Sequence, residues 1–286
     1  MRKTISELFD YGRKILDERC NDPYLDSKLD VLVLLSESLS VSKEFLFINP
    51  NFKPEPVLVE KFLSFLDRRS SGEPIAYILN KKEFMSLPFY VSKDCLIPRP
   101  ETEILTELAI DFCNKKDSSV FLDMCCGSGC ISISVAHYAK KANIFASDLS
   151  EKAISIAKIN AEKNGVEDRI DFFCGNLFQP LPNDLRFDFI ASNPPYISEY
   201  DEISPSVVNF EPKLALYSED DGLEITEKII KESINRLNFN GVLAVEINSS
   251  KGFEVKKLFC DNGFSEVSII KDYNGLDRVV RGVLVG

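Results

Sequence analysis

The chain has 286 residues, of which 44% are hydrophobic and 28% charged, a balance typical of a globular protein with a substantial core. Its longest aliphatic run, 31–35, is far too short to cross a bilayer, and its start lacks the apolar segment of a signal peptide. We therefore expect a cytoplasmic protein without membrane contact. The net charge of −11 falls almost entirely after residue 90, where 31 acidic residues outnumber 21 basic ones, which argues against generic binding to nucleic acid.

The first part of the chain is predicted to be helical. Thr4 and Glu7 have the spacing of a capping box, and the apolar residues after them recur at helical intervals. Further helices are predicted over 24–39 and 56–69, and the segment SSGEP at 70–74 then breaks the pattern.

A connector follows these helices. Short apolar pieces at 76–79 and 83–91, with a turn expected at Leu87-Pro88, predict a strand-rich segment. We divide the chain into an N-terminal helical domain, a β-hairpin connector and a larger domain, with the bounds 1–70, 71–98 and 99–286.

From about residue 100 onward, predicted strands and helices alternate. Such alternation indicates an α/β protein with a mostly parallel, doubly wound sheet, whose ligands bind at the carboxyl ends of the strands. The predicted strands are 119–124, 143–147, 170–174, 187–192, 242–247, 265–271 and 278–285, and the predicted helices are 129–140, 150–164, 223–237 and 253–262.

The eight cysteines contain no CxxC pair, and a long chain without a secretory signal favours reduced thiols over a disulfide framework. Cys125, Cys126 and Cys130 lie close together, but their spacing does not suit a tetrahedral metal site and the chain has one histidine. We expect no metal, and small apolar roles for these thiols in and after a tight loop.

The segment FLDMCCGSGC, 121–130, is predicted to run from a strand through a glycine-rich loop into a helix. Glycines there let the backbone adopt positive φ and approach a ligand closely. The segment lacks the GxGxxG spacing of a dinucleotide-binding loop, so the alternative is a plain tight turn. The candidate cofactor-binding residues of this segment are Asp123, Cys125, Cys126, Gly127, Ser128 and Gly129.

Two further strand ends carry candidate cofactor contacts. Asp148 ends the second strand of the sheet, where a carboxylate can accept hydrogen bonds from both hydroxyls of a ribose, although by itself it could simply begin a helix. Asn176 and Leu177 follow the third strand, where an amide could contact an adenine edge and an aliphatic side chain could pack on its face.

These three strand ends together resemble the class I S-adenosylmethionine-dependent methyltransferases. The resemblance implies a Rossmann-like sheet of seven strands, the last antiparallel, with S-adenosyl-L-methionine over the glycine-rich loop. The family usually has glycine where this chain has Cys125, and some relatives carry an aromatic residue in place of Leu177.

The fourth strand stops at Asn193-Pro194-Pro195-Tyr196, and two prolines cannot continue a central strand because neither has an N–H. This motif resembles one found in methyltransferases of this class. There the motif marks enzymes that methylate a nitrogen conjugated to a π-system. The resemblance implies that the Asn193 side-chain oxygen and the Pro194 carbonyl accept the two N–H hydrogens of the substrate, and that Tyr196 offers a flat face. Asn193, Pro194 and Tyr196 are thus the candidate catalytic residues, and Asn193 is also a candidate cofactor contact.

The segments 72–105, 211–224 and 272–282 resemble the bacterial protein glutamine methyltransferases that act on class I peptide chain release factors. This implies methylation of the side-chain amide nitrogen (N5) of the glutamine in a Gly-Gly-Gln loop. Arg99 and Glu101, in the segment IPRPETE, join the four residues of the motif as candidate substrate contacts. We expect a monomer whose helical domain recognises the release factor, and the alternative is that this domain only stabilises its neighbour.

Two other functions stay open. One is methylation of adenine or guanine in nucleic acid by the same motif, which the acidic charge after residue 90 and the lack of a basic, aromatic patch disfavour. The other is a non-enzymatic protein that binds the cofactor, which the intact Asn193 and glycine-rich loop disfavour.

Overall fold

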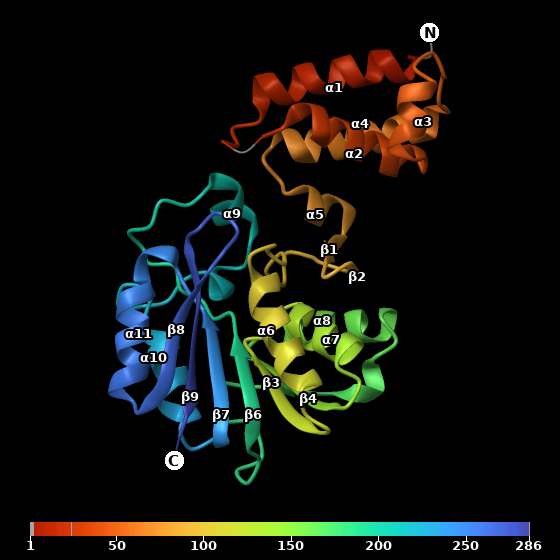
Figure 1. Ribbon diagram of the computed structural model, residues 1–286. Helices are drawn as coiled ribbons and strands as arrows, with labels where there is room; N and C mark the ends of the chain where they lie inside the picture. The colour runs from red at the N-terminus through yellow and green to blue at the C-terminus, as the bar shows by residue number, and fades with distance from the viewer. Residues whose placement is uncertain (1–2, 24, 286) are drawn as a thin grey trace. The chain divides into compact units, whose positions relative to one another are not determined.

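The computed structural model describes residues 3–23 and 25–285 (Figure 1). The chain forms two compact units, one of Met1–Asn80 with Glu202–Glu211 and the other of Lys81–Asp201 with Pro212–Gly286. In the described residues, no helix is both long and apolar enough to span a membrane.

The first unit is helical, as predicted for the start of the chain. The capping box is confirmed: the Glu7 backbone N–H donates to the Thr4 hydroxyl over 3.2 Å, and the Thr4 N–H donates to the Glu7 carboxylate over 2.7 Å. The predicted start of the second helix at Tyr24 lies outside the described residues. Helices of this unit are α1 (Ile5–Arg19), α2 (Ser27–Leu39), α3 (Lys43–Ile48), α4 (Pro56–Ser70), α5 (Ile75–Leu79) and α9 (Pro205–Phe210).

A buried ion cluster and a separate apolar core hold these helices together. Arg69 of α4 is 5% exposed and binds the carboxylates of Asp22 and Asp30 over 2.9 and 2.7 Å. The separate apolar core consists of side chains from α1, α2, α3, α4 and α5, with Leu8, Leu34 and Phe62 fully buried.

The predicted connector is wrong in two details. The piece 76–79 is helical, because the backbone carbonyl of Pro74 accepts from the N–H groups of Tyr77 and Ile78 and so starts a helical turn. The chain reverses two residues earlier than predicted, at Met85-Ser86, where both residues have positive φ. Pro88 instead lies in a strand, exposed, because a two-stranded hairpin leaves one side of each strand free of pairing. The hairpin strands are β1 (Lys82–Phe84) and β2 (Leu87–Phe89).

The second unit is built on a sheet whose seven strands, counted over the described residues, run in the order β5-β4-β3-β6-β7-β9-β8. The pairs up to β7 are parallel, whereas β9 is antiparallel to β7 and to β8, so the predicted doubly wound sheet with an antiparallel last strand is confirmed. Its strands are β3 (Ser119–Met124), β4 (Ala142–Asp148), β5 (Ile170–Cys174), β6 (Phe187–Ser192), β7 (Leu237–Glu246), β8 (Phe264–Lys271) and β9 (Asp277–Leu284).

Helices cover both faces of this sheet (Figure 1). Apolar residues of α6, α7 and α8 pack on one face and those of α10 and α11 on the other. The strand order reverses between β3 and β6, and this reversal opens a crevice at the carboxyl ends of the strands. These helices are α6 (Thr102–Asn114), α7 (Cys130–Tyr138), α8 (Glu151–Lys163), α10 (Glu224–Ser233) and α11 (Gly252–Asp261), with short 3-10 turns at Glu167–Arg169, Lys213–Ala215 and Ser249–Lys251.

Two of the sequence predictions for this unit need correction. Helix α6 was not expected, although its apolar residues pack on the sheet. The helix predicted over 223–237 ends at Ser233, and β7 begins at Leu237, five residues before the predicted strand. The register of β6 and β7 shifts between Phe187 and Phe189, and Asn240 has a positive φ of 58°. The early part of β7 is therefore irregular, which hides its strand pattern in the sequence.

Candidate active site

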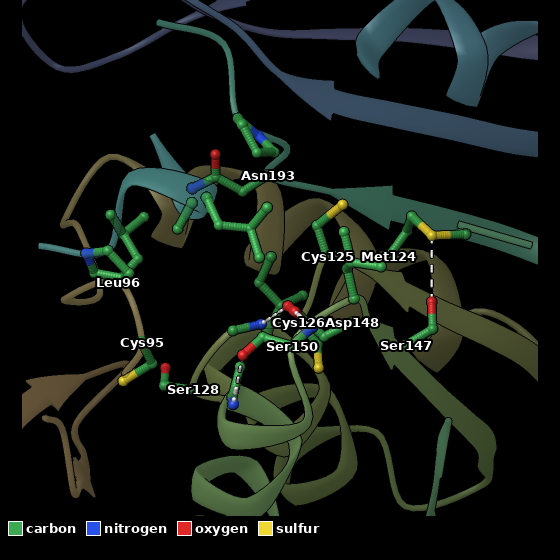
Figure 2. A pocket seen from close by; sticks show the side chains of 18 of the residues that line it. Cys95, Leu96, Met124, Cys125, Cys126, Ser128, Ser147, Asp148, Ser150 and Asn193 are labelled. Atoms are coloured by element: carbon green, nitrogen blue, oxygen red, sulfur yellow. Dashed lines mark hydrogen bonds between the residues drawn. The ribbon is translucent and has the colours of Figure 1, made fainter. Parts of the chain in front are cut away.

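A pocket of about 1150 Å³, open solvent included, lies at the carboxyl ends of the parallel strands (Figure 2). Its lining is mainly apolar, with a few polar groups brought in by the strand ends, as is usual for ligand sites in such sheets. The predicted site residues that line it are Arg99, Cys125, Cys126, Gly127, Ser128, Asp148, Asn176, Leu177, Asn193 and Pro195. The predicted residues outside that lining are Asp123, Gly129, Glu101, Pro194 and Tyr196.

The glycine-rich loop after β3 has the backbone that its sequence predicts. Gly127 and Gly129 have φ of 54° and 78°, in the left-handed region. Around Gly127, the described residues leave more than 4 Å free where a side chain would begin, so the backbone is open to a ligand. A Cβ on Gly129 would instead approach side-chain atoms of Ala157 and Ile133 to 3.0 Å, so this glycine lets α7 pack against α8.

Cys125 also has a left-handed backbone, with φ of 62°. Such a conformation costs an L-residue about 1–2 kcal/mol but costs glycine nothing. This is the physical reason for the expected glycine at this place, and Cys125 keeps the same backbone at that cost. Burial raises the pKa of the Cys125 thiol well above its ordinary value of 9.0, so the thiol is neutral.

Asp148 stands at the end of β4, next to the loop. Its Oδ2 accepts from the Gly127 N–H and its Oδ1 from the Ser150 N–H, both over 2.8 Å. Burial raises the pKa of Asp148, and the hydrogen bonds from Ser150 and Gly127 lower it. The lone pairs that backbone groups do not occupy can accept from a ligand hydroxyl.

Asn176 and Leu177 follow β5 in the lining, the first exposed and the second buried, with the Leu177 backbone at a φ of 48°. Asp123, by contrast, is fully buried behind the loop: its Oδ2 accepts from the Ser132 N–H over 2.9 Å. Among the described residues its Oδ1 has no hydrogen-bond partner, and burial raises the pKa of Asp123 from 3.8 to about 7.

The motif after β6 contacts two residues that are not among the predicted site residues. The Asn193 side-chain Nδ2 donates to the Thr102 hydroxyl over 3.1 Å, and the Tyr196 hydroxyl donates to Oε1 of Glu246 over 3.2 Å. Ser192 donates to the Met124 carbonyl over 2.8 Å, which ties the ends of β6 and β3 together. The strand-end rule points to Glu246 once β7 is known to neighbour β6.

A third unpredicted residue, Asn160 of α8, is completely buried and supports the loop from behind. Its Nδ2 donates to the carbonyls of Ser128 and Tyr90, both over 2.9 Å, and its Oδ1 accepts from the Tyr90 N–H over 2.6 Å. No sequence pattern marks it, because its partners are backbone groups distant in the chain.

Arg99 and Glu101 lie just before α6, and Arg99 lines the pocket while Glu101 precedes the first residue of the helix. Over residues 3–23 and 25–285, no group of three or more His, Cys, Asp and Glu side chains is placed to hold a metal ion.

Known proteins match both parts of the chain. The family described as Methyltransferase small domain matches residues 100–210, and the family described as PrmC N-terminal domain matches residues 7–79. A release factor glutamine methyltransferase of Clostridium acetobutylicum is 36% identical over 276 residues, which cover 95% of this chain and 95% of that protein. One of Fusobacterium nucleatum is 39% identical over 255 residues, covering 88% of this chain and 72% of that protein.

Among solved structures, the hMettl16 catalytic domain in complex with a 3′UTR hairpin is similar, with a TM-score of 0.57. It is 19% identical, covers 76% of this chain and 84% of that one, and so shows the shared fold. The sequence matches identify the family more narrowly than the shared fold does, because they extend over both the helical part and the pocket. On the basis of these matches, the chain belongs to the release factor glutamine methyltransferase family.

Proposed function

We propose that this protein transfers a methyl group from S-adenosyl-L-methionine to the side-chain amide nitrogen of the glutamine in the Gly-Gly-Gln loop of class I peptide chain release factors. The observation that carries the proposal is the orientation of Asn193. Its Nδ2 is held by Thr102, so its Oδ1 is left to accept a hydrogen bond in the pocket. Relatives 36% and 39% identical to this chain carry the name of this activity.

Two observations support binding of the methyl donor in this pocket. The backbone at Gly127 is open, and Asp148 presents a carboxylate with lone pairs left over after its backbone contacts. Asp148 would hold the ribose hydroxyls, Leu177 and Asn176 the adenine, and the loop from Cys125 to Ser128 the amino-acid part. When bound, S-adenosyl-L-methionine supplies an electrophilic methyl group on sulfur. Gly129 and Asp123 support the loop from behind.

The protein then has to orient a weak nucleophile. An amide nitrogen shares its lone pair with the carbonyl group, so the substrate –NH2 must be turned until that lone pair faces the methyl group. The Asn193 Oδ1 and the Pro194 carbonyl accept its two hydrogens. Pro194 and Pro195 fix the backbone, so both acceptors stand ready before the substrate arrives. Tyr196 contributes a flat face beside the amide, and Arg99 and Glu101 contact the substrate loop.

A small amide offers few atoms for recognition, so specificity needs contacts with the rest of the release factor. We assign that role to the helical domain, 1–70, with 71–98 as connector and 99–286 as the catalytic domain. The enzyme acts as a cytoplasmic monomer on a protein substrate, without direct contact to nucleic acid. The acidic charge after residue 90 supports a protein substrate over a polyanion.

A methyl-transfer assay with labelled S-adenosyl-L-methionine tests the proposal. Release factor, free glutamine and DNA are offered side by side at equal concentration, with a release factor whose loop glutamine is replaced by glutamate as the control. We expect label in the intact release factor alone. Label in DNA, or equal label in the glutamate variant, would contradict the proposal.

A further inference from the structure

The segment 212–225, which ends in the first turn of α10, forms part of the pocket wall. The residues of this segment that line the pocket are Pro212, Leu214, Ala215, Tyr217 and Ile225. Most of the segment belongs to the stretch 211–224, by which the sequence resembles its family, yet none of the predicted site residues comes from it. Its backbone also contacts the chain directly after the motif Asn193–Tyr196.

Ile197, the residue after this motif, is paired with the segment through both of its backbone groups. Its N–H donates to the Leu216 carbonyl over 2.9 Å, and its carbonyl accepts from the Ser218 N–H over 3.0 Å. These bonds form a single parallel bridge between Ile197 and Tyr217, outside the named strands. A single bridge holds the chain at one point, so a second contact beside it decides how firmly the motif is held.

Gly222 provides that second contact, because its backbone lies directly against the backbone of Tyr196. A Cβ at Gly222 would stand 2.4 Å from the Tyr196 carbonyl oxygen and 3.1 Å from its carbonyl carbon. A flexible side chain could rotate away from such a clash, whereas a peptide group cannot. Gly222 also has a φ of 84°, in the left-handed region. Glycine is therefore required here for two reasons, the close approach and the backbone conformation.

The turn that carries Gly222 is tied to its surroundings. The Glu219 carbonyl accepts from the N–H groups of Gly222 and Glu224 over 3.1 and 3.2 Å, which joins the turn to the start of α10. Asp221 forms an ion pair with Lys251, which follows β7. Because the turn is anchored in this way, a residue larger than glycine would press on the motif instead of moving the turn alone.

The other end of the motif is fixed by the sheet. Ser192, the last residue of β6, pairs with Met124 of β3 and with Val245 of β7. Between this end and the Gly222 contact, two consecutive prolines restrict rotation about their N–Cα bonds. The chain therefore has few ways to absorb a displacement, and a push on the Tyr196 carbonyl shifts the whole motif.

We propose that Gly222 is a positioning residue, whose contact with the Tyr196 carbonyl fixes the path of the motif. The inference rests on the proposed function of this site, in which Asn193, shown at the pocket in Figure 2, and the Pro194 carbonyl accept from the substrate amide. A Cβ at Gly222 needs about 3.4 Å to the carbonyl oxygen for ordinary contact, so the two backbones would have to separate by about 1 Å. A misplacement of about 1 Å at a reacting group costs about a hundredfold in rate.

The alternative is a plain turn glycine that is needed for its φ alone. Gly263 provides the matched control: it has the same φ of 84°, and a Cβ there would meet no atom of the described residues within 4 Å. It precedes β8, at the end of the sheet away from the pocket. Asparagine adopts a left-handed backbone more readily than alanine does, but its Cβ occupies the same place. The two substitutions therefore separate backbone strain from contact with the motif.

The experiment uses the full chain with the variants Gly222→Ala, Gly222→Asn, Gly263→Ala and Gly263→Asn. kcat and KM for release factor are measured at saturating S-adenosyl-L-methionine, with cofactor affinity by isothermal calorimetry and Tm by calorimetric melting. We expect both Gly222 variants to lower kcat about a hundredfold, with KM and cofactor affinity nearly unchanged. Both Gly263 variants should keep the kcat of the wild type. Tm should follow the strain, with alanine below asparagine at each position.

The asparagine variant also guards against a failure to fold. If Gly222→Ala does not fold, Gly222→Asn decides the matter, because its backbone strain is smaller and its Cβ meets the same carbonyl. A wild-type kcat in either Gly222 variant would overturn the inference. So would a kcat that follows Tm across all four variants, which is the behaviour of a plain turn glycine.

A second readout reports the contact itself and does not depend on turnover. With ¹³C in the tyrosine carbonyls and ¹⁵N in the isoleucine amides, NMR correlation spectra select Tyr-Ile pairs, of which the sequence has two, Tyr77-Ile78 and Tyr196-Ile197. The Tyr196-Ile197 signal should move in the Gly222 variants and stay in the Gly263 variants. The Tyr77-Ile78 signal, from α5, should stay in all four.

The two readouts separate this inference from the proposed function. An unmoved Tyr196-Ile197 signal in the Gly222 variants counts against the role of Gly222, whatever the enzyme methylates. A wild type that is inactive on release factor, beside a signal that moves as expected, counts against the proposed function alone.

Discussion

The carboxylate of Asp148 accepts a hydrogen bond from the backbone N–H of Gly127 over 2.8 Å, and so joins the end of β4 to the loop that follows β3. The same carboxylate lines the pocket, together with Gly127. One side chain therefore shapes the glycine-rich loop and offers the remaining lone pairs to a ligand. Removing it should affect binding of the methyl donor and leave the chemistry of the reacting nitrogen in place.

For Asp148→Ala we expect weaker binding of S-adenosyl-L-methionine, with a smaller effect on turnover once the enzyme is saturated. A hydrogen bond to a charged group contributes about 1.5–3 kcal/mol, which corresponds to a tenfold to hundredfold loss of affinity. Isothermal calorimetry measures it. Asp171→Ala, an exposed carboxylate on the neighbouring strand β5, is the matched control and should bind normally. Unchanged affinity in Asp148→Ala would remove it from the cofactor site.

Asn193→Ala should abolish methyl transfer and keep cofactor binding nearly intact. Loss of one oriented polar contact to the reacting group costs about 2.7–4 kcal/mol, or two to three orders of magnitude in kcat. Single-turnover kinetics with release factor, beside calorimetry with the cofactor, separates the two effects. Asn235→Ala, at an exposed position before β7, serves as the control. Near-normal turnover of Asn193→Ala would exclude this side chain from the mechanism.

The left-handed backbone at Cys125 predicts an order of stability for two variants. Cys125→Gly relieves the positive φ, whereas Cys125→Ala removes the same thiol and keeps the strain. The glycine variant should therefore unfold at a higher free energy than the alanine variant, by about 1 kcal/mol. Chemical denaturation of both proteins without ligand measures the difference. An alanine variant as stable as the glycine variant would show that this backbone is unstrained.

The raised pKa of Glu246, about 7 against 4.5 for a free glutamate, predicts how stability changes with pH. Between these values the unfolded chain has lost this proton and the folded protein keeps it. Stability therefore falls as the pH rises from 4.5 to 7 and levels off above, by at most about 1.4 kcal/mol per pH unit for one carboxyl.

Asp123, with a pKa of about 7 against 3.8, adds to the fall in the same direction. Unfolding free energies of the wild type and Glu246→Gln, measured across this range, isolate the part that belongs to Glu246. The variant should show the shallower slope. Parallel slopes in the two proteins would mean that Glu246 titrates near its ordinary value.

The helical domain is expected to supply recognition of the release factor. A chain that starts near Ser71 keeps both core clusters of the sheet, and the core of the helical unit is separate from them. It should bind S-adenosyl-L-methionine normally and methylate release factor with a raised KM and a similar kcat. Equal rates of the shortened and complete chains at low release-factor concentration would leave the helices with a stabilising role only.

The pocket could be predicted from the sequence because ligands of parallel sheets bind at the carboxyl ends of the strands, and the residues that end these strands can be recognised in the sequence. Gly127 follows a buried strand, Asp148 ends one, and Asn193 stands where prolines stop one. Thr102 and Glu246 were not among the predicted site residues, for a different reason. Their roles depend on the order of strands, which places β7 beside β6, and on the start of α6, and neither is encoded in local spacing.

The local errors also have physical causes. At Met85-Ser86 two non-glycine residues adopt positive φ, so no glycine in the sequence marks the turn. Pro88 is of a residue type common in turns and therefore suggested a turn, but it lies in a strand. The segment 76–79 is too short for apolar spacing to separate a helical turn from a strand. The segment is helical because the backbone carbonyl of Pro74 accepts hydrogen bonds from the N–H groups of Tyr77 and Ile78.

The most direct test of the account is to locate the methyl group. Class I release factor is incubated with the full chain and S-adenosyl-L-methionine, digested, and sequenced by fragmentation mass spectrometry. The account predicts one added methyl group, on the glutamine of the Gly-Gly-Gln peptide and on its side-chain nitrogen, and none when Asn193→Ala replaces the wild type. A methyl group on another residue, or an unmodified release factor from an enzyme that binds the cofactor, would contradict it.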